Sequence, residues 1–223
     1  MEIDEKIQHA IEHTEVVRPP KQNLSTFGIT NIYYYLVTEL MESANVVREG
    51  RVIAARPKIV TPAYLINLEG FSGQAKRFIE MMAEKHPHEA GIFYSYKNEP
   101  KEMNIVSEPM EKVVNKIGQQ IDSHGDPLTA IIKGVEEMWD VSLIKFTYEL
   151  TNKSVHTNIA EMEKRGLMHV DKEGIPADAR NYIEALFEKT RRDPAYAPVL
   201  LAELKRWNLF HEYQDRFLNL FRK

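Results

Sequence analysis

Residues 45–60, NVVREGRVIAARPKIV, and residues 107–117, SEPMEKVVNKI, bound the stretch that decides the fold of this chain. Along residues 45–117 the spacing of apolar side chains changes from every second residue to about every 3.6 residues and back, and it does so twice. The shorter period is typical of a strand and the longer one of a helix. The stretch therefore predicts a hairpin, a helical segment, a second hairpin and another helix.

Glycine and proline mark the ends of these elements. Gly50 lies between strands expected at 45–48 and 51–60, where glycine can adopt the positive φ of a hairpin turn. Residues 98–100, Asn-Glu-Pro, predict the turn of the second hairpin. Ser107 and Pro109 form a cap and first-turn proline that start a helix. The expected inward stripe of that helix consists of Met110, Val113, Val114, Ile117 and Ile121.

Apolar patterns on either side of this stretch predict further elements. Residues 3–13 have the spacing of a helix, and residues 32–40, IYYYLVTEL, are rich in side chains that favour strands. Residues 128–132 predict a buried strand, and the pattern is helical from residue 136 onward. The expected class is α+β, with an antiparallel or mixed sheet of about five to six strands, packed helices and a helical C-terminal lobe. The matching division is a helical arm with its linker at 1–24, an α+β lobe at 25–134 and a helical lobe at 135–223.

The helix expected after residue 136 carries two apolar stripes. Trp139, Leu143, Phe146 and Leu150 form the first, and Val141, Ile144 and Tyr148 form the second. Such a helix is usually buried on both sides.

Composition excludes several classes of protein. The net charge of −4 does not suit a strongly basic surface for nucleic acid or for anionic membranes. The chain has no cysteine, which excludes disulfides, thiolate metal sites and cysteine nucleophiles. No apolar run reaches the roughly 20 residues that cross a bilayer, and the N-terminus is not of the signal-peptide type. We therefore expect a cytoplasmic protein that does not enter membranes.

Basic residues on the first hairpin suggest an anion site. The cluster, opposed only by Glu49, consists of Arg48, Arg51, Arg56 and Lys58. Residues two apart in a strand project from one face, as expected for Arg56 and Lys58. With Tyr33 or Tyr35 these cations would hold a phosphate or carboxylate. Alternatively, the charges protect a sheet edge from aggregation.

Histidines suggest a metal site in two places. His9, Glu12 and His13 resemble the H-x-x-E-H motif of the inverted zinc peptidases, in which two histidines on one helix face bind zinc. His86 and His88 form a second cluster, which would need His124 of another predicted loop to approach it. The alternative is a solvated polar surface in both places.

Residues 141–174 are similar to the end of a winged helix, with a turn at 152–154 before a recognition helix. The residues expected to contact nucleic acid are Lys153, His156, Thr157, Asn158, Lys164 and Arg165. A helix–turn–helix packing unit without nucleic acid is the alternative. Residues 70–73, Gly-Phe-Ser-Gly, also resemble the G-x-x-G loop of a KH domain, although neither central residue is basic.

The C-terminal residues suggest self-association. Large apolar groups recur at helical spacing from residue 197 to the end, and they require burial. We expect docking onto the helical lobe together with a homodimer contact near Trp207, Phe210, Phe217 or Phe221. The first expectation for function is a non-catalytic binding or assembly protein, the second a nucleic-acid-associated regulator and the third a metal-dependent hydrolase with histidine ligands. Whether the chain is an enzyme, and which cofactor it uses, stays open.

Overall fold

The computed structural model describes residues 3–61, 64, 77, 80–81, 84–85 and 89–222. Within these residues the chain forms an α+β fold with a mixed sheet and with helices toward the C-terminus, as predicted. It divides into two compact units: unit 1 comprises Met1–Pro57 and Tyr94–Asn158, and unit 2 comprises Lys58–Phe93 and Ile159–Lys223. Each unit combines two segments, whereas the sequence suggested consecutive parts.

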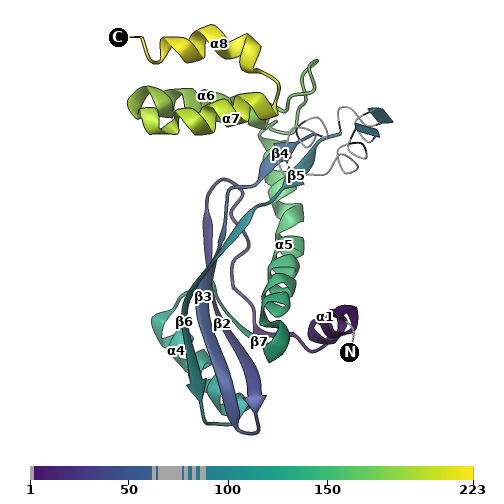
Figure 1. Ribbon diagram of the computed structural model, residues 1–223, viewed down its shortest axis with the longest axis vertical. Helices are drawn as coiled ribbons and strands as arrows, with labels where there is room; N and C mark the ends of the chain where they lie inside the picture. Colours follow the sequence, from purple (N-terminus) through teal and green to yellow (C-terminus); the bar gives the residue numbers. More distant parts are fainter. Residues whose placement is uncertain are drawn as a thin grey trace. The chain divides into compact units, whose positions relative to one another are not determined.

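Unit 1 is built on a five-stranded sheet (Figure 1). In spatial order the strands are β1 (Glu15–Arg18), β7 (Thr129–Val135), β2 (Thr30–Met41), β3 (Ala44–Ala54) and β6 (Tyr96–Val106). β2 and β7 are parallel, and the other neighbouring strands are antiparallel. β6 is therefore one edge of the sheet and the short strand β1 is the other.

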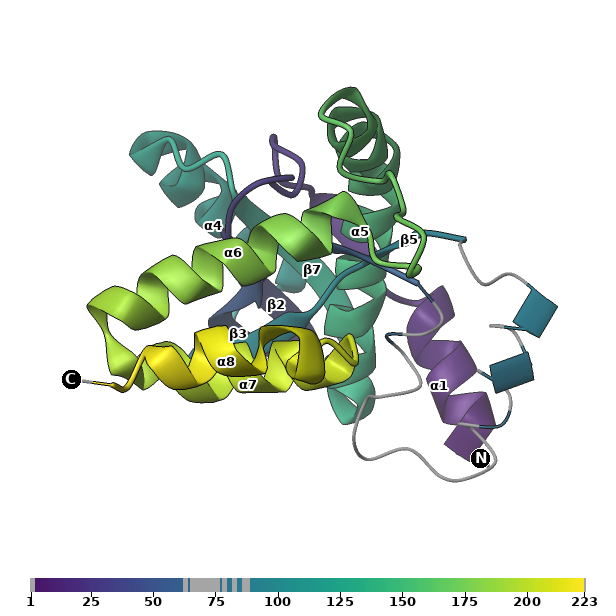
Figure 2. The same ribbon diagram turned by 90° about the horizontal axis from the view of Figure 1, so that it is seen from above.

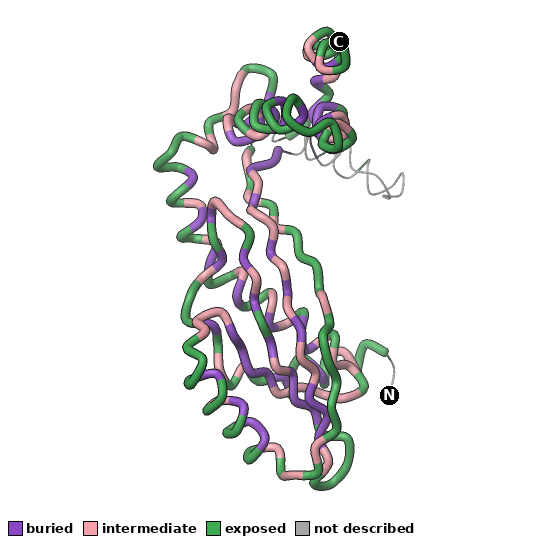
Figure 3. The backbone as a smooth tube through the Cα atoms, turned by 90° about the vertical axis from the view of Figure 1, so that its left-hand side faces the viewer, coloured by how far each residue is buried: buried purple, intermediate pink, exposed green. Residues whose placement is uncertain are grey.

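A helix packs on each face of this sheet (Figure 1). α4 (Met110–His124) covers one face and α5 (Trp139–Lys164) covers the other. Because side chains alternate along a strand, Ile32 and Leu36 of β2 lie under α5 while Val37 lies under α4. The predicted stripe of α4 faces this core, and Figure 3 shows the buried segments alternating with exposed ones. We call the two sides of the sheet the α4 face and the α5 face.

The N-terminal helix α1 (Ile3–Glu12) is the predicted one, and it packs on unit 1. Ala10 is fully buried, and Lys6 forms an ion pair of 2.9 Å with Glu137. Just after the helix, the Thr14 hydroxyl donates to Ser142 Oγ of α5 at 2.7 Å.

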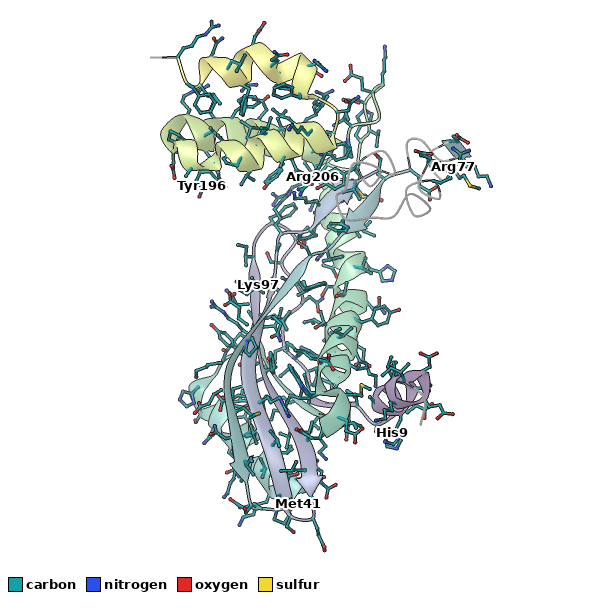
Figure 4. The ribbon with its side chains drawn as sticks, in the orientation of Figure 1. His9, Met41, Arg77, Lys97, Tyr196 and Arg206 are labelled. Carbon is teal, nitrogen blue, oxygen red and sulfur yellow. The ribbon has the colours of Figure 1, made fainter. Side chains whose placement is uncertain are left out.

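The hairpin turn predicted at Gly50 is wrong. β3 is continuous through Gly50, and the turn that joins β2 to β3 lies between Met41 and Ala44, where Ser43 has a φ of 60° (Figure 4). Glycine is required at position 50 for space. A Cβ atom there would lie 2.4 Å from the Tyr34 hydroxyl oxygen. The glycine thus marks a close approach of strands rather than a turn.

The turn predicted around Pro100 is also wrong, because β6 runs through it. The β3–β6 register shifts at this point: Glu49 pairs with Glu102 and Gly50 pairs with Pro100, which leaves Lys101 as an extra residue. An edge strand with a bulge tolerates proline, since one of its sides needs no ladder hydrogen bonds.

The helix break predicted at residues 152–154 is wrong as well. α5 is continuous across it. Ser154 and Asn158 are buried, and they bind the segment before β2: Ser154 Oγ accepts the Leu24 N–H at 3.0 Å, and the Asn158 amide hydrogen-bonds to Thr26 Oγ1 at 3.0 Å. Polar residues that looked like a turn therefore attach the helix to its own unit.

Among its described residues, unit 2 has a two-stranded sheet and, after α5, three α-helices. β4 (Lys58–Val60) pairs with β5 (Gly91–Phe93), and α6 (Ala177–Arg192), η2 (Pro194–Tyr196), α7 (Ala197–Arg206) and α8 (Phe210–Asn219) follow. α7 packs against both α6 and α8 (Figure 2). The core includes Phe187, Leu200, Leu204 and Trp207.

A buried carboxylate joins the elements of unit 2. Glu203 of α7 is 2% exposed and accepts hydrogen bonds from Lys58 Nζ at 3.0 Å and from the Tyr64 hydroxyl at 3.4 Å. Burial, followed by the Glu203 charge, raises the pKa of Tyr64 to about 12. Arg206 forms an ion pair of 3.3 Å with the other carboxylate oxygen. Both carboxylate oxygens of this buried side chain therefore have partners.

Candidate functional site

A pocket of about 550 Å³ lies on the α4 face of unit 1. Its volume falls within the range of roughly 300–1,000 Å³ that is common for small-molecule sites. The lining comes from β2, β3, β6, β7, α4 and the loop after α4, and its polar residues include Tyr33, Tyr35, Glu49, Lys101, Gln120, His124, Asp126 and Thr129. The pocket therefore depends on elements that lie far apart in the sequence.

Two tyrosines of β2 form an aromatic wall. Tyr33 and Tyr35 are two residues apart, so both side chains project from the α4 face. α4 covers Val37 but leaves Tyr33 exposed and Tyr35 half-buried. Burial, and then the nearby Glu49 carboxylate, raises the pKa of Tyr35 above its ordinary value. Tyr35 therefore remains a protonated phenol at neutral pH.

The C-terminal end of α4 provides the opposite wall. Gly125 caps the helix with a φ of 71° and lets the chain turn toward β7. His124 Nδ1 lies 2.7 Å from the Gln120 carbonyl oxygen, which can only accept, so Nδ1 carries a proton. In the neutral ring, Nε2 is then a hydrogen-bond acceptor. Asp126 Oδ1 accepts the Leu128 N–H at 2.8 Å.

Glu49 is the carboxylate on the floor of the pocket. In the sheet register it pairs with Tyr35 of β2 on one side and with Glu102 of β6 on the other. Lys101 Nζ lies 3.7 Å from its Oε2, and the Lys101 side chain is largely exposed. Because the separation is long and Lys101 is exposed to water, this ion pair contributes little, and the Glu49 carboxylate remains available to a ligand.

A smaller hollow of about 200 Å³ lies beside the pocket. The two share Tyr35, Glu49 and Gln120, and the smaller one is also lined by Glu108 and Lys116. Together they follow α4 along the part of the sheet that the helix leaves open.

The comparisons with known proteins add no functional information. No family model, curated protein or solved structure matches the chain. Among the helices that the structure describes, none has the length and apolar character to cross a bilayer.

The basic cluster proposed as an anion site is not brought together. Arg48 binds Glu136 on the α5 face, whereas Arg51 projects from the α4 face and pairs with Glu99 at 2.7 Å. Arg56 lies between strands, and Lys58 belongs to unit 2, where its partner is Glu203. The hypothesis assumed one strand at 51–60, and β3 in fact ends at Ala54.

The histidines of α1 do not form a ligand set. The rings of His9 and His13 lie against each other with centroids 3.9 Å apart, and His13 Nδ1 donates to the His9 carbonyl oxygen at 2.8 Å. Glu12 accepts from Gln8 at 2.7 Å. Within the described part of the chain there is no group of three or more candidate ligands. His86 and His88, like the G-x-x-G segment at 70–73, lie outside the described residues.

The nucleic-acid candidates do not lie at the start of a recognition helix, because α5 continues through them. Asn158 is buried in unit 1. Lys153, His156 and Thr157 are exposed, and Lys164 and Arg165 are exposed at the end of α5. The spacing of the first three places them on one side of the helix.

The C-terminal interface candidates mostly belong to the core of unit 2. Trp207 and Phe217 are buried, Phe210 packs against them, and Phe221 is half-exposed. The docking that we expected within the helical lobe therefore accounts for most of these aromatic groups.

A different apolar surface is exposed on the α5 face of unit 1. The second stripe of α5 was expected to be buried, yet Ile144 is 68% and Tyr148 is 63% exposed. On the edge strand β6, Met103 and Ile105 are 62% and 63% exposed. Between α5 and β6 lies a groove of about 420 Å³ whose lining, which includes Tyr96, contains no charged residue. We call this groove, together with the exposed apolar residues of α5 and β6 beside it, the α5–β6 surface.

The sequence contained only weak signals for the pocket. From sequence, Tyr33 and Tyr35 are expected only beside the anion site, Glu49 as the charge that opposes its cations, and His124 as a possible metal ligand. The alternation along β2 indicates which tyrosines share a face. Their approach to His124 depends on the parallel pairing of β2 with β7, which local patterns do not predict.

Proposed function

We propose that this chain is a non-catalytic binding protein whose ligand site is the pocket at the C-terminal end of α4. The observation that supports the proposal is the convergence of two tyrosines, two carboxylates and one histidine on a single cavity of suitable size. Such a combination of apolar surface and a few polar groups is the usual composition of a small-molecule site. We place the protein in the cytoplasm, in keeping with its composition.

A pocket-filling variant tests this proposal. Gln120 lies on the exposed side of α4 and lines the pocket, so Gln120→Trp fills the cavity without entering the core. We expect a thermal-shift screen of small organic molecules to yield a ligand, and Gln120→Trp to weaken its binding at least about tenfold, or roughly 1.4 kcal/mol. The neighbouring Gln119 is exposed and lines no described pocket, so Gln119→Trp is the matched control. If both variants lose the same amount of ligand affinity, or if neither loses any, the ligand binds elsewhere.

We also propose that two copies of the chain associate through the α5–β6 surface. Two features support a second copy as the occupant. The groove carries no charge, and a two-fold interface places each surface against itself, where like charges would repel. In addition, β6 has a neighbour on one side only among the strands that the structure describes, so its other edge can pair with the same edge of a second copy.

Mutations can distinguish a dimer formed through the α5–β6 surface from one formed through the C-terminal helices. We expect light scattering at micromolar concentration to show a dimer, and Ile144→Asp to convert it to a monomer because the carboxylate would be buried without a partner. Phe221→Asp on the half-exposed C-terminus is the matched control and should leave the dimer intact. A monomeric unaltered protein, or a dimer that only Phe221→Asp disrupts, would refute this interface.

A nucleic-acid partner is the second candidate function, and the exposed side of α5 at Lys153, His156 and Thr157 favours it. If these residues contact a phosphate backbone, Lys153→Ala should weaken DNA binding and reduce its salt dependence by about one counterion. Fluorescence anisotropy with duplex DNA at low salt measures both. Lack of binding by the unaltered protein would exclude this function.

A further inference from the structure

We infer that the pocket on the α4 face selects a small organic cation, a protonated amine attached to an apolar or aromatic group. The inference rests on the proposed function, because it specifies the chemical class of the ligand for the same site. Its basis is that hydrogen-bond acceptors and electron-rich surfaces from separate elements face one cavity.

Three acceptors line the cavity. Glu49 of β3 provides a carboxylate, and its Lys101 partner is exposed and at the outer limit of an ion pair. Asp126 uses Oδ1 for the Leu128 N–H, while Oδ2 has no partner among the described residues. His124 provides Nε2, because its Nδ1 proton is held by the Gln120 carbonyl. Among the described residues, no three candidate ligands lie close enough together to hold a metal ion. Acceptors spaced in this way suit an organic molecule that carries an N–H donor.

The C-terminal end of α4 also favours a positively charged ligand. α4 is 15 residues long, and its C-terminus at His124 and Gly125 is the end that borders the cavity. The last carbonyl groups of a helix carry a partial negative charge, which attracts cations and repels anions. An anionic ligand would therefore meet the helix end, Glu49 and Asp126 together, with Lys101 as the one lysine or arginine in the described lining.

The rings of Tyr33 and Tyr35 provide aromatic surfaces that also favour a cation. The faces of phenol rings attract ammonium groups through the ring quadrupole, and they also contact the apolar part of an amine. Tyr33 and Tyr35 present two such rings from one strand. The ammonium of Lys101, 3.7 Å from Glu49, occupies the kind of position that a ligand ammonium would take. Because Lys101 is mostly exposed, a ligand can displace it without burying an unpaired cation.

Three matched probes test this selectivity: 2-phenylethylamine, 2-phenylethanol and phenylacetate, which differ chiefly in charge. We expect titration calorimetry with the full chain to show the amine binding at least about tenfold more tightly than the other two at neutral pH. Glu49→Gln keeps the size of the side chain and should remove most of that preference. Glu102→Gln is the matched control, because Glu102 pairs with Glu49 in the sheet and does not line the pocket.

The possible outcomes separate this inference from the proposed function. If no molecule in a broad screen binds the pocket, the proposed function fails, and the inference fails with it. Equal binding of the three probes overturns the inference and leaves the pocket as a ligand site. A preference for the amine that survives Glu49→Gln, or that Glu102→Gln removes equally, also overturns it. Replacing Tyr35 by Phe should preserve amine binding, whereas Leu should weaken it, since only Phe retains an aromatic face.

Discussion

Gly50→Ala is expected to lower the free energy of unfolding by about 2–3 kcal/mol, as is usual for overpacking in a well-packed core. A Cβ atom at this position would lie 2.4 Å and 2.7 Å from the Oη and Cζ atoms of Tyr34, and 2.9 Å from the Glu99 carbonyl oxygen. Tyr34 is buried and its hydroxyl is hydrogen-bonded to Asn98, so the ring has little room to move. The Glu99 oxygen belongs to the backbone of β6 and is held by the sheet.

Gly50→Asn tests the two interpretations of this glycine against each other. A hairpin turn with positive φ tolerates asparagine well, so the turn predicted from sequence expects a small effect. A glycine between packed strands excludes any Cβ, so the structure expects Asn to destabilise at least as much as Ala. Chemical denaturation followed by circular dichroism measures both variants.

Gly91→Ala is the matched control, because a Cβ atom there meets nothing within 4 Å. We expect its effect to stay within about 0.5 kcal/mol, as for most surface substitutions. A Tyr34→Phe background provides a second check, since it removes the atom nearest to the added Cβ and should reduce the cost of Gly50→Ala. Tolerance of both Ala and Asn at position 50 would contradict the close approach of β2, β3 and β6.

The different fates of Gly50 and α4 show which parts of the fold were predictable. The stripe of Val113, Val114, Ile117 and Ile121 extends over more than two helical turns, and a helix needs only local hydrogen bonds to form such a stripe. Gly50 and Pro100 are single residues whose signals have two meanings, a turn or a bulge in a strand. The meaning is decided by pairing between strands, here β3 with β6, which lie about 50 residues apart in the register.

The exposed stripe of α5 has a similar explanation. Ile144 and Tyr148 have the spacing of a buried face, and the sequence led us to expect burial on both sides. The sheet covers only the side of Leu143, Phe146 and Leu150. A sequence pattern reports that a surface is apolar, but it does not distinguish cover by the same chain from cover by a partner.

The candidate pocket depends both on a local pattern, which the sequence shows, and on the pairing of distant strands, which it does not. Alternation along β2 indicates that Tyr33 and Tyr35 share a face, which is a local property. Their position opposite His124 requires the parallel pairing of Tyr33 with Thr129 and of Tyr35 with Ile131. Such pairs join segments almost 100 residues apart, and no motif in the chain specifies them. The sequence therefore indicates some of these side chains, namely Tyr33, Tyr35, Glu49 and His124, but not how they come together in one site.

The second large effect concerns Arg48, which the sequence assigned to an anion site and the structure assigns to an internal ion pair. Its Nη1 and Nη2 donate to Glu136 Oε2 and Oε1 at 2.7 Å and 2.6 Å. The Thr38 hydroxyl also hydrogen-bonds Glu136, and the Arg48 guanidinium lies 5.1 Å from the centre of the Trp139 ring. The Arg48 and Glu136 side chains are 13% and 26% exposed, so water screens this pair only partly.

We expect Arg48→Met to lower the free energy of unfolding at neutral pH by about 2–4 kcal/mol, because it leaves a partly buried carboxylate without its cation. Glu136→Gln in the same background should recover much of the loss, since the neutral pair has no unpaired charge. Arg191→Ala is the control: Arg191 forms an exposed pair with Glu188, and such pairs contribute about 0–1 kcal/mol. A loss that Glu136→Gln does not relieve would show that the packing of Arg48, rather than its charge, is what matters.

The difference in the free energy of unfolding between Arg48→Met and the unaltered protein should depend on pH, which gives an independent check. Hydrogen bonds from Arg48, assisted by Thr38 and opposed by burial, lower the pKa of Glu136 below its ordinary value. A carboxylate with a lowered pKa in the folded state stabilises the fold above its unfolded pKa, about 4.3, and this contribution is lost as the pH falls through the folded pKa. In Arg48→Met, burial without a cation favours the protonated acid, so the variant gains stability relative to the unaltered chain on acidification. Denaturation at pH 7 and at about pH 4 should therefore show the gap between the two proteins narrowing, and a gap that stays constant would mean that Glu136 is not the carboxylate that Arg48 stabilises.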